Sequence, residues 1–353
     1  MAKILMKGNE AVGEAAIRAG CRFFFGYPIT PQSELPEYMS LHLPKVGGVY
    51  LQAESEIAAI NMVYGAAGCG ARVMTGSSSP GIALKQEGIS YMAGAELPCV
   101  IVNMMRGGPG LGSIQPAQSD YFQSTRGGGD GDYRLLVYAP ASVQEMVDYV
   151  QIAFDKADKY RNPVLVVGDG VIGQMMEPVE FVSKPAENLP EKDWATTGTG
   201  GKREPNIINS LYLDAEKLER HNIHLSKKYS YMQENEQRWE ATGLEGAELV
   251  IVAYGTTARI ARSAMDNLNK KGWKIGLLRP ITLWPFPEKG FQLLDETTKH
   301  LLVVEMSMGQ MIDDVRIVNE GKRKIHFTGR SGGVIPSTSL IEEKILEILE
   351  RSE

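Results

Sequence analysis

The sequence lacks the cysteine patterns of disulfide-rich and iron–sulfur proteins. It has three cysteines in 353 residues, all far apart and none in a C-x-x-C pair. An iron–sulfur cluster normally needs four thiolates, so neither a cluster held by this chain alone nor a disulfide framework is expected. We predict that Cys21, Cys69 and Cys99 are small buried hydrophobic residues.

Long apolar runs and blocks of basic residues are also missing. No stretch approaches the roughly 20 apolar residues of a membrane-spanning helix. Charged residues interrupt the first 20 positions, so a signal-peptide core is not expected there. The net charge is −6 without a Lys/Arg cluster, which argues against a nucleic-acid partner. We therefore expect a cytoplasmic protein that binds neither membrane nor nucleic acid.

Nucleotide and metal signatures are weak or absent. The glycine-rich segments form neither G-x-G-x-x-G nor G-K-[ST]. Gly-Asp-Gly triplets begin at Gly129 and Gly168, but a thiamine-diphosphate and Mg²⁺ motif needs an Asn roughly 30 residues further on, and the nearest asparagines are badly placed. We predict that both triplets are turns. His221 and His224 lie in a charged segment without further ligands, so no metal site is expected.

The first half of the sequence alternates helices with short apolar strands. Runs such as Cys99-Val-Ile-Val and Val164-Leu-Val-Val suit a parallel sheet covered on both faces. The patterns predict helices at 9–19, 56–67, 82–93 and 142–159, and strands at 23–27, 49–52, 72–76, 99–105, 135–138 and 164–168.

Composition changes after Met176. Residues 184–209 are rich in Pro, Thr, Gly and charge, which indicates a loop, and residues 213–242 suit a mostly solvated charged helix. A second α/β pattern follows, with strands at 249–254, 274–279 and 300–305 and helices at 258–271 and 340–351. We predict an α/β protein with one domain at 1–183, a linker and charged helix at 184–243, and a second domain at 244–353.

Three local features carry candidate chemistry. In Gly26-Tyr-Pro-Ile-Thr-Pro-Gln-Ser-Glu34 a strand ends, Thr30 can cap a helix and Pro31 can be its first residue. Such a helix start is either an anion-binding site of an α/β protein or a simple capped turn. Glu56 begins a helix beside an apolar stripe, so it is either a surface partner of the helix dipole or a carboxyl in a pocket. Arg106 follows a strand and precedes glycines. Its guanidinium can therefore bind the carboxylate of a ligand, or the segment is a mobile loop with a solvated arginine.

Together these segments resemble the α subunits of 2-oxoacid:ferredoxin oxidoreductases. The resemblance rests on Tyr27-Pro-Ile-Thr-Pro31, Glu54-Ser-Glu56-Ile-Ala-Ala-Ile, Ser79-Pro-Gly81, Arg106-Gly-Gly-Pro-Gly and Gly131-Asp-Tyr133, in this order. In the second half, Leu278-Arg-Pro-Ile-Thr-Leu-Trp-Pro-Phe-Pro and Val304-Glu-Met-Ser-Met-Gly-Gln310 look like a transketolase C-terminal domain. The resemblance implies a thiamine-diphosphate pyrimidine-type domain with a parallel sheet, followed by a transketolase C-terminal-like α/β domain.

The resemblance also implies roles for individual residues. Glu56 matches the glutamate that hydrogen-bonds the aminopyrimidine ring of thiamine diphosphate and helps to activate it, and Glu54 ranks second for this role. Thr30 and Arg106 match contacts to the 2-oxoacid, with Arg106 on its carboxylate. The matching loops place Pro28, Ile29, Ser79 and Pro80 at the cofactor, and the chain itself binds no metal.

The implied reaction is a coenzyme A-dependent oxidative decarboxylation of a 2-oxoacid, with electrons passing to ferredoxin. It requires partners, namely a β subunit with the diphosphate and Mg²⁺ half-site and a small ferredoxin-like subunit with the iron–sulfur clusters. The segment Gly26–Tyr38 looks closer to family members that act on 3-methyl-2-oxobutanoate than to those that act on 2-oxoglutarate, which is the alternative substrate. Ser77-Ser-Ser-Pro-Gly81 departs from the family's Thr-Ser-Gly-Pro-Gly loop, and a non-catalytic scaffold subunit is the competing hypothesis.

Overall fold

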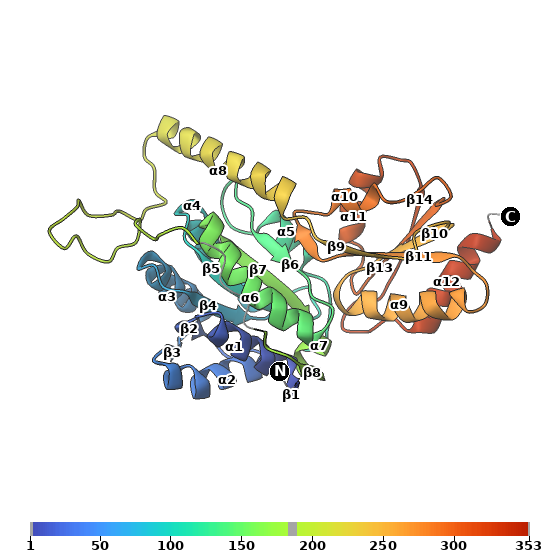
Figure 1. Cartoon of the computed structure of the whole chain (residues 1–353), viewed down its shortest axis with the longest axis horizontal. Helices are drawn as coiled ribbons and strands as arrows, with labels where there is room; N and C mark the ends of the chain where they lie inside the picture. Colours follow the sequence, from blue (N-terminus) through green and yellow to red (C-terminus); the bar gives the residue numbers. More distant parts are fainter. Residues whose placement is uncertain (1–2, 183–188, 352–353) are drawn as a thin grey trace.

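The computed structural model describes residues 3–182 and 189–351, and it contains two large sheets that both carry helices on their faces (Figure 1). A seven-stranded sheet forms the first part of the molecule and a five-stranded sheet the second. Residues 184–188 of the predicted loop and the predicted boundary at 183 lie outside the described residues. Among the described residues, no helix combines the length and apolar composition needed to cross a membrane.

The first sheet has the strand order β12-β6-β7-β5-β4-β2-β3. All its strands are parallel to their neighbours except β12, which pairs antiparallel with β6. The central strands β5 and β7 are buried along their whole length and are mostly apolar, with Asn103 and Asp169 as exceptions. The strands are β2 (Phe23–Gly26), β3 (Val49–Gln52), β4 (Val73–Ser77), β5 (Cys99–Met105), β6 (Leu136–Tyr138), β7 (Pro163–Asp169) and β12 (Thr282–Trp284).

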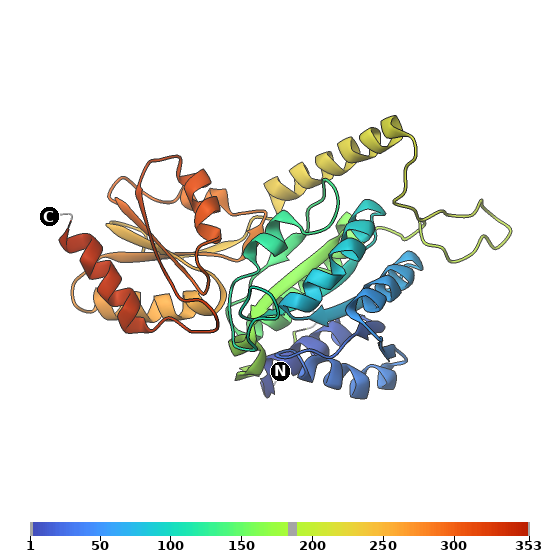
Figure 2. The same cartoon turned by 180° about the vertical axis from the view of Figure 1, so that it is seen from behind.

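Helices cover both faces of the first sheet (Figures 1 and 2). Crossovers between parallel strands are right-handed, so connections that run in opposite directions across the sheet place their helices on opposite faces. One face carries α1 (Gly8–Arg18), α2 (Glu34–His42) and α6 (Val143–Tyr160). The other carries α3 (Glu56–Gly68) and α4 (Ser79–Gly94).

The second sheet has the order β14-β13-β10-β11-β9, with only β9 antiparallel to its neighbour. Its strands are β9 (Trp239–Thr242), β10 (Leu249–Val252), β11 (Ile275–Pro280), β13 (His300–Glu305) and β14 (Lys324–Gly329). Helices α9 (Gly255–Asn269) and α12 (Thr338–Glu350) cover one face, and α10 (Glu288–Phe291) and α11 (Met311–Asn319) lie on the other (Figure 1).

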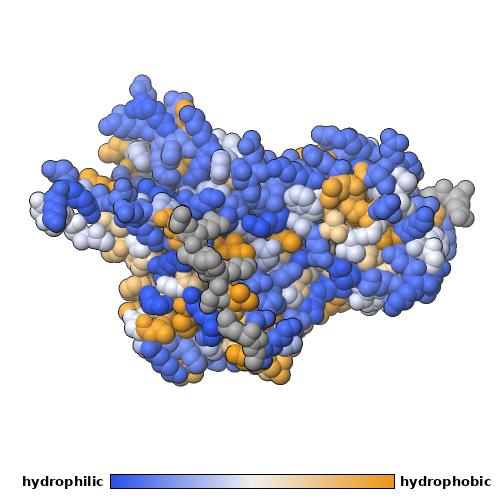
Figure 3. Space-filling model, in the orientation of Figure 1, coloured by the Kyte–Doolittle hydropathy of each residue, from blue (hydrophilic) through white to orange (hydrophobic). Residues whose placement is uncertain are grey.

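A long charged helix, α8 (Ala215–Asn235), follows the extended segment that projects from the first sheet. Leu225, Tyr229 and Met232 form its buried stripe, and its outer surface is largely hydrophilic (Figure 3). The predicted solvated helix is therefore confirmed, although it ends earlier than expected and β9 follows it. Shorter elements are β1 (Ile4–Lys7), β8 (Met176–Val179), α5 (Tyr121–Arg126), α7 (Gly170–Gln174) and a 3-10 turn at Pro44–Val46.

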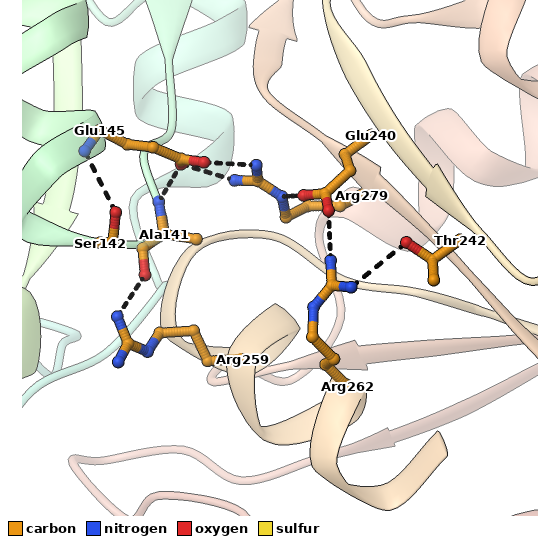
Figure 4. A network of polar contacts seen from close by, with 8 residues as sticks. All are labelled: Ala141, Ser142, Glu145, Glu240, Thr242, Arg259, Arg262 and Arg279. Carbon is orange, nitrogen blue, oxygen red and sulfur yellow. Dashed lines mark hydrogen bonds and ion pairs between the residues drawn. The ribbon is translucent and has the colours of Figure 1, made fainter. Parts of the chain in front are cut away.

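Charged side chains connect the two sheets. The Arg279 guanidinium donates to both carboxylate oxygens of Glu145 at 2.7 and 2.8 Å and to Glu240 at 2.9 Å (Figure 4). Arg262 extends this network by donating to Glu240. Strand β12 adds a second connection, because it comes from the second half of the chain but pairs with β6. The two sheets thus share one packed interface.

Several predictions about local structure are wrong. The helix after β2 begins at Glu34 rather than Pro31, because Ile29–Gln32 forms a hydrogen-bonded turn and Pro36 takes the first helical turn instead. Cys69 is exposed, whereas Cys21 and Cys99 are buried as predicted. Asp169 in the second Gly-Asp-Gly triplet ends β7 and caps α7 through the Val171 and Ile172 N–H groups, so that triplet is not a simple turn.

Candidate active site

Four segments with candidate chemistry follow four adjacent parallel strands. In the order β3-β2-β4-β5, Glu56 follows β3, Thr30 follows β2, Ser79 follows β4 and Arg106 follows β5. The carboxyl ends of parallel strands lie at one edge of the sheet. After β2 the chain crosses to β3 on one side of the sheet, and after β4 it crosses to β5 on the other side. A crevice therefore forms between the carboxyl ends of the adjacent strands β2 and β4. The sheet thus brings all the predicted site segments to one edge.

Glu56 lies at the first position of α3 and is 7% exposed. Ser55 caps this helix by accepting a hydrogen bond from the Ala58 N–H at 3.1 Å, which leaves the Glu56 side chain free of any capping role. Within the described part of the chain, no hydrogen bond to the Glu56 carboxylate is found. The competing residue, Glu54, is exposed before the helix begins. A buried carboxylate without internal partners suits an external hydrogen-bonding group.

The start of α4 packs directly against this carboxylate. A Cβ atom at Gly81 would lie 2.8 Å from Oε1 of Glu56 and 2.1 Å from Oγ of Ser77, so only glycine allows this approach. Ser77 is fully buried and its hydroxyl has no partner among the described residues. Both side chains therefore point into the same small space.

Arg106 connects two loops of the site. Its guanidinium donates to the Thr30 carbonyl through Nη1 and to the Leu111 carbonyl through Nη2, both at 3.0 Å. The side chain is 6% exposed, and its buried Nε has no partner in the described chain. The Thr30 side chain is exposed beside it. The two predicted substrate residues, Thr30 and Arg106, are thus adjacent. Two N–H groups of the Arg106 guanidinium already donate to backbone carbonyls.

The predicted cofactor residues lie on the same two loops. Pro28 is exposed and Ile29 half-buried on the turn after β2, and Pro80 is half-buried in the first turn of α4. Ser79 is buried, and its hydroxyl accepts from the Arg106 backbone N–H at 3.0 Å. These positions bring the two loops to the same crevice.

An acidic residue that the sequence did not suggest supports this loop. Asp120 accepts hydrogen bonds from the Ser79 hydroxyl at 2.5 Å and from the Asn103 amide at 2.9 Å. Burial raises the pKa of Asp120, while the two hydrogen bonds and the positive charge of Arg106 oppose that rise. Asp120 therefore braces the start of α4 against β5. No sequence pattern marked it, because its partners come from distant parts of the chain.

Two other buried polar residues were also missed. Gln32 is fully buried after β2, and neither its amide oxygen nor its nitrogen has a partner among the described residues. Lys85 is fully buried in α4, on a stripe with Ile82 and Ile89. The sequence did contain a signal for Lys85, because it lies three positions after Ile82 and four before Ile89 on one face of the predicted helix. The site therefore contains more buried polar groups than the motifs alone indicated.

Comparison with family models agrees with this geometry. Residues 14–239 match the family described as "Pyruvate flavodoxin/ferredoxin oxidoreductase, thiamine diP-bdg", and residues 247–341 match "Pyruvate:ferredoxin oxidoreductase core domain II". The first match covers more than half of the chain and includes all the predicted site residues.

Two curated relatives match along almost the whole chain. The ketoisovalerate oxidoreductase subunit VorB of Methanothermobacter marburgensis is 50% identical, covering 100% of this chain and 99% of the relative. The 2-oxoglutarate synthase subunit KorA of Methanocaldococcus jannaschii is 36% identical, covering 97% of this chain and 98% of the relative.

Solved structures share the fold. The 2-oxoglutarate:ferredoxin oxidoreductase from Magnetococcus marinus, with 2-oxoglutarate, coenzyme A and succinyl-CoA bound, is 29% identical with a TM-score of 0.86, and the match covers 98% of this chain and 65% of that one. A split-gene transketolase at 13% identity and a TM-score of 0.61, covering 98% of both chains, shows the fold alone. The predicted α/β fold with a thiamine-diphosphate-type domain is thereby confirmed, and the chain belongs to the 2-oxoacid:ferredoxin oxidoreductase family.

Proposed function

We propose that this chain is the pyrimidine-side subunit of a complex that oxidatively decarboxylates 3-methyl-2-oxobutanoate to an acyl-coenzyme A and CO₂, with electrons passing to ferredoxin. The observation that carries the proposal is the crevice at the ends of β2 and β4, where the buried side-chain atoms of Ser77 and Gln32 have no hydrogen-bonding partner in the described chain and Glu56 is 7% exposed. Buried polar groups are normally paired, so these groups fit a bound polar ring.

Glu56 is proposed as the residue that exchanges a proton with the cofactor. When bound, thiamine diphosphate would supply the nucleophilic carbon needed for chemistry at the 2-oxo group of the substrate. The Glu56 carboxyl would hydrogen-bond a nitrogen of the aminopyrimidine ring and hold or release a proton at Oε1. Gly81 supports this role because its lack of a side chain leaves the carboxylate accessible from the crevice. Pro28, Ile29, Ser79 and Pro80 would contact the cofactor from the flanking loops.

Thr30 and Arg106 are proposed to orient the substrate. The exposed Thr30 hydroxyl would donate to an oxygen of the 2-oxoacid, and guanidinium N–H groups not used for the two carbonyls would bind its carboxylate. Because Arg106 also ties the loop after β5 to Thr30, both groups keep a fixed separation. A positive group that holds the carboxylate orients the substrate, and it does not retain the neutral CO₂ once that product forms.

The proposed substrate has a single carboxylate and a branched apolar side chain. Within the site segments 27–34, 54–56, 77–81 and 106–116, Arg106 is the only Lys or Arg residue. Ile29, Leu111 and Ile114 on the same segments are apolar. A second carboxylate, as in 2-oxoglutarate, would require a further cation from outside these segments. The higher identity to the ketoisovalerate relative than to the 2-oxoglutarate relative supports the same choice.

Partner subunits are proposed to complete the site. On helices α3 and α4 the side chains of Ile57, Leu84 and Tyr91 are between 41% and 51% exposed. Exposed apolar side chains beside the proposed active site are typical of a surface that a partner protein covers. A β subunit would supply the diphosphate and Mg²⁺ contacts, and a small ferredoxin-like subunit the iron–sulfur clusters. We also retain the cytoplasmic location and the division into 1–183, 184–243 and 244–353 as proposals. The separate sheets support that division, although β12 crosses it.

The test is reduction of a low-potential viologen dye by the purified complex of this chain with its neighbouring subunits. The assay contains thiamine diphosphate and coenzyme A, with 3-methyl-2-oxobutanoate, 2-oxoglutarate and pyruvate compared at equal concentration. We expect the highest kcat/KM with 3-methyl-2-oxobutanoate. Faster turnover of 2-oxoglutarate would overturn the substrate, and no reduction by a complex with intact clusters would favour a non-catalytic scaffold.

A further inference from the structure

Gln310, the last residue of the motif Val304–Gln310, has no role in the mechanism above. It precedes α11 in the second half of the chain, and its side chain crosses to the first half. The amide nitrogen of Gln310 donates to the Ser119 carbonyl at 2.7 Å, and the amide oxygen accepts from the Phe122 N–H at 2.8 Å. One side chain therefore holds the backbone on both sides of Asp120.

A second glutamine crosses the same interface in the opposite direction. Gln118 is fully buried, and its backbone N–H donates to the Met306 carbonyl at 2.8 Å. Its side-chain oxygen accepts from the Met306 N–H at 2.9 Å, and its amide nitrogen donates to the Tyr254 carbonyl at 2.8 Å. The turn that carries Asp120 is thus anchored in the second half of the chain, although Asp120 belongs to the first.

Asp120 connects this turn to the proposed active site. Its carboxylate accepts from the Ser79 hydroxyl at 2.5 Å and from the Asn103 amide at 2.9 Å, and the Asn103 amide oxygen accepts from the Ser79 N–H at 3.1 Å. The Ser79 hydroxyl in turn accepts from the Arg106 backbone N–H at 3.0 Å. All four residues are at most 8% exposed, so water competes little for these hydrogen bonds.

A second contact between the two halves shows what packing alone requires. The Arg126 guanidinium on α5 donates to both carboxylate oxygens of Asp314 on α11, at 3.0 and 3.1 Å. This ion pair joins the two helices directly. The hydrogen bonds of Gln310 lead further, through Asp120 to the loops that carry Ser79 and Arg106.

We propose that Gln310 is a positioning residue for the active site, because its amide fixes the turn from which Asp120 holds Ser79 and the Arg106 backbone. The proposal rests on the proposed function, in which Ser79 contacts the cofactor and Arg106 the substrate carboxylate. A displaced turn moves both contacts together. Misplacement of reacting groups by about 1 Å can lower a rate about 10²-fold, so this link affects catalysis as well as stability.

Three single variants of the complete complex test this role. Gln310→Met keeps the length of a half-buried side chain but removes both hydrogen bonds. Ser79→Ala removes the hydroxyl that joins Asp120 to the Arg106 N–H. Arg126→Met is the matched control, because it removes a contact between the same two helices but leaves the hydrogen bonds around Asp120 in place.

The first readout is hydrogen–deuterium exchange of the complex without cofactor or substrate. We expect Gln310→Met to speed exchange in segments 77–82 and 104–108 at least about threefold, because their hydrogen bonds open more often. Arg126→Met should leave both segments unchanged. Unchanged exchange in Gln310→Met, or an equal increase in Arg126→Met, would overturn the proposal.

The second readout is a double-mutant cycle on kcat/KM for the 2-oxoacid that the complex turns over fastest. We expect Gln310→Met to lower kcat/KM about tenfold, and the double variant to fall little below Ser79→Ala alone, because both changes break one path. Losses that multiply in the double variant, or no loss in Gln310→Met, would overturn the proposal. Failure of the proposed function is distinct, since wild type then reduces no dye while the exchange experiment still decides the role of Gln310.

Discussion

Two buried glutamates at strand ends have opposite surroundings. Glu56 follows β3 in the first sheet and Glu305 ends β13 in the second, and both are close to the start of a helix. The Glu305 carboxylate is saturated by one hydroxyl and three backbone N–H groups, from Ser307, Gln310, Met311 and Ile312. Glu56 has no such bond within the described chain. A saturated buried carboxylate stabilises a fold, whereas an unsaturated one can bind something else.

Two serines repeat the contrast. Ser307 donates to Glu305 at 2.8 Å and accepts from the Gly309 N–H at 3.0 Å. Ser77 is equally buried but unpartnered among the described residues, in contact with the same glycine as Glu56. Ser307 thus uses its hydroxyl for internal hydrogen bonds, whereas the Ser77 hydroxyl stays unused among the described residues. This difference supports the proposed site in the first sheet.

The largest effect should come from Glu56→Gln. The substitution keeps the shape of the side chain but removes the group proposed to exchange a proton, so we expect kcat of the complex to fall about 10²–10⁴-fold. The free energy of unfolding should change little, because no internal hydrogen bond is lost. Initial rates of dye reduction and urea unfolding measure the two. Unchanged turnover would remove Glu56 from the mechanism.

Glu305→Gln should reverse this pattern. An amide cannot accept all four hydrogen bonds as a charged carboxylate does, so we expect a loss of about 2–3 kcal/mol in the free energy of unfolding. The kcat per folded complex should stay within about twofold of wild type. Urea titrations of both variants give the direct comparison. A stable Glu305→Gln protein would mean that its hydrogen bonds contribute little.

Arg106→Lys should affect substrate binding more than proton exchange. Lysine keeps the charge but lacks the fork that spans the Thr30 and Leu111 carbonyls, so we expect kcat/KM for the 2-oxoacid to fall about 10–100-fold. Thiamine-diphosphate affinity, measured by calorimetry on the complex, should change less than about threefold. Equal losses in both would indicate that Arg106 only maintains the loop. Arg262→Lys, in the network between the sheets, is the control for loss of an arginine fork.

The smallest effect separates the two serines. Ser307→Ala removes a donor to a buried carboxylate, and we expect a cost of about 1–2 kcal/mol. Ser77→Ala removes a hydroxyl that has no partner in the described chain, so the cofactor-free protein should change by less than about 0.5 kcal/mol. Thermal unfolding with and without thiamine diphosphate measures both. A large cost of Ser77→Ala without cofactor would show that Ser77 does have an internal partner.

The motifs predicted the positions of the site better than its details. Glu56 lies at a helix start against a buried stripe, as its pattern predicted, and the roles assigned to Glu56, Thr30 and Arg106 stay predictions. The expected cap at Thr30 was wrong, because two prolines compete within seven residues and the helix uses Pro36. Turn geometry of this kind depends on neighbours such as Asn9 and Gln174, which bond the Pro31 carbonyl from distant positions.

Strands at sheet edges were harder to predict than central ones. Strands β5 and β13 match their predicted ranges, because short apolar runs identify them, and β3 matches its range although it lies at the edge of the first sheet. Strands β1, β8, β9, β12 and β14 were not predicted, since pairing with one neighbour leaves little local signal. Strand β12 is the clearest example, because its partner β6 lies more than 140 positions earlier in the chain.

Periodicity and local motifs were enough to establish an α/β chain, its main elements and the three segments that carry the chemistry. Only the tertiary structure brought those segments to one edge of one sheet, and only it separated the unpartnered Glu56 from the saturated Glu305. The reason is physical. Helix and strand patterns depend on neighbours a few positions apart, whereas the partners of a buried polar group can come from anywhere in the chain.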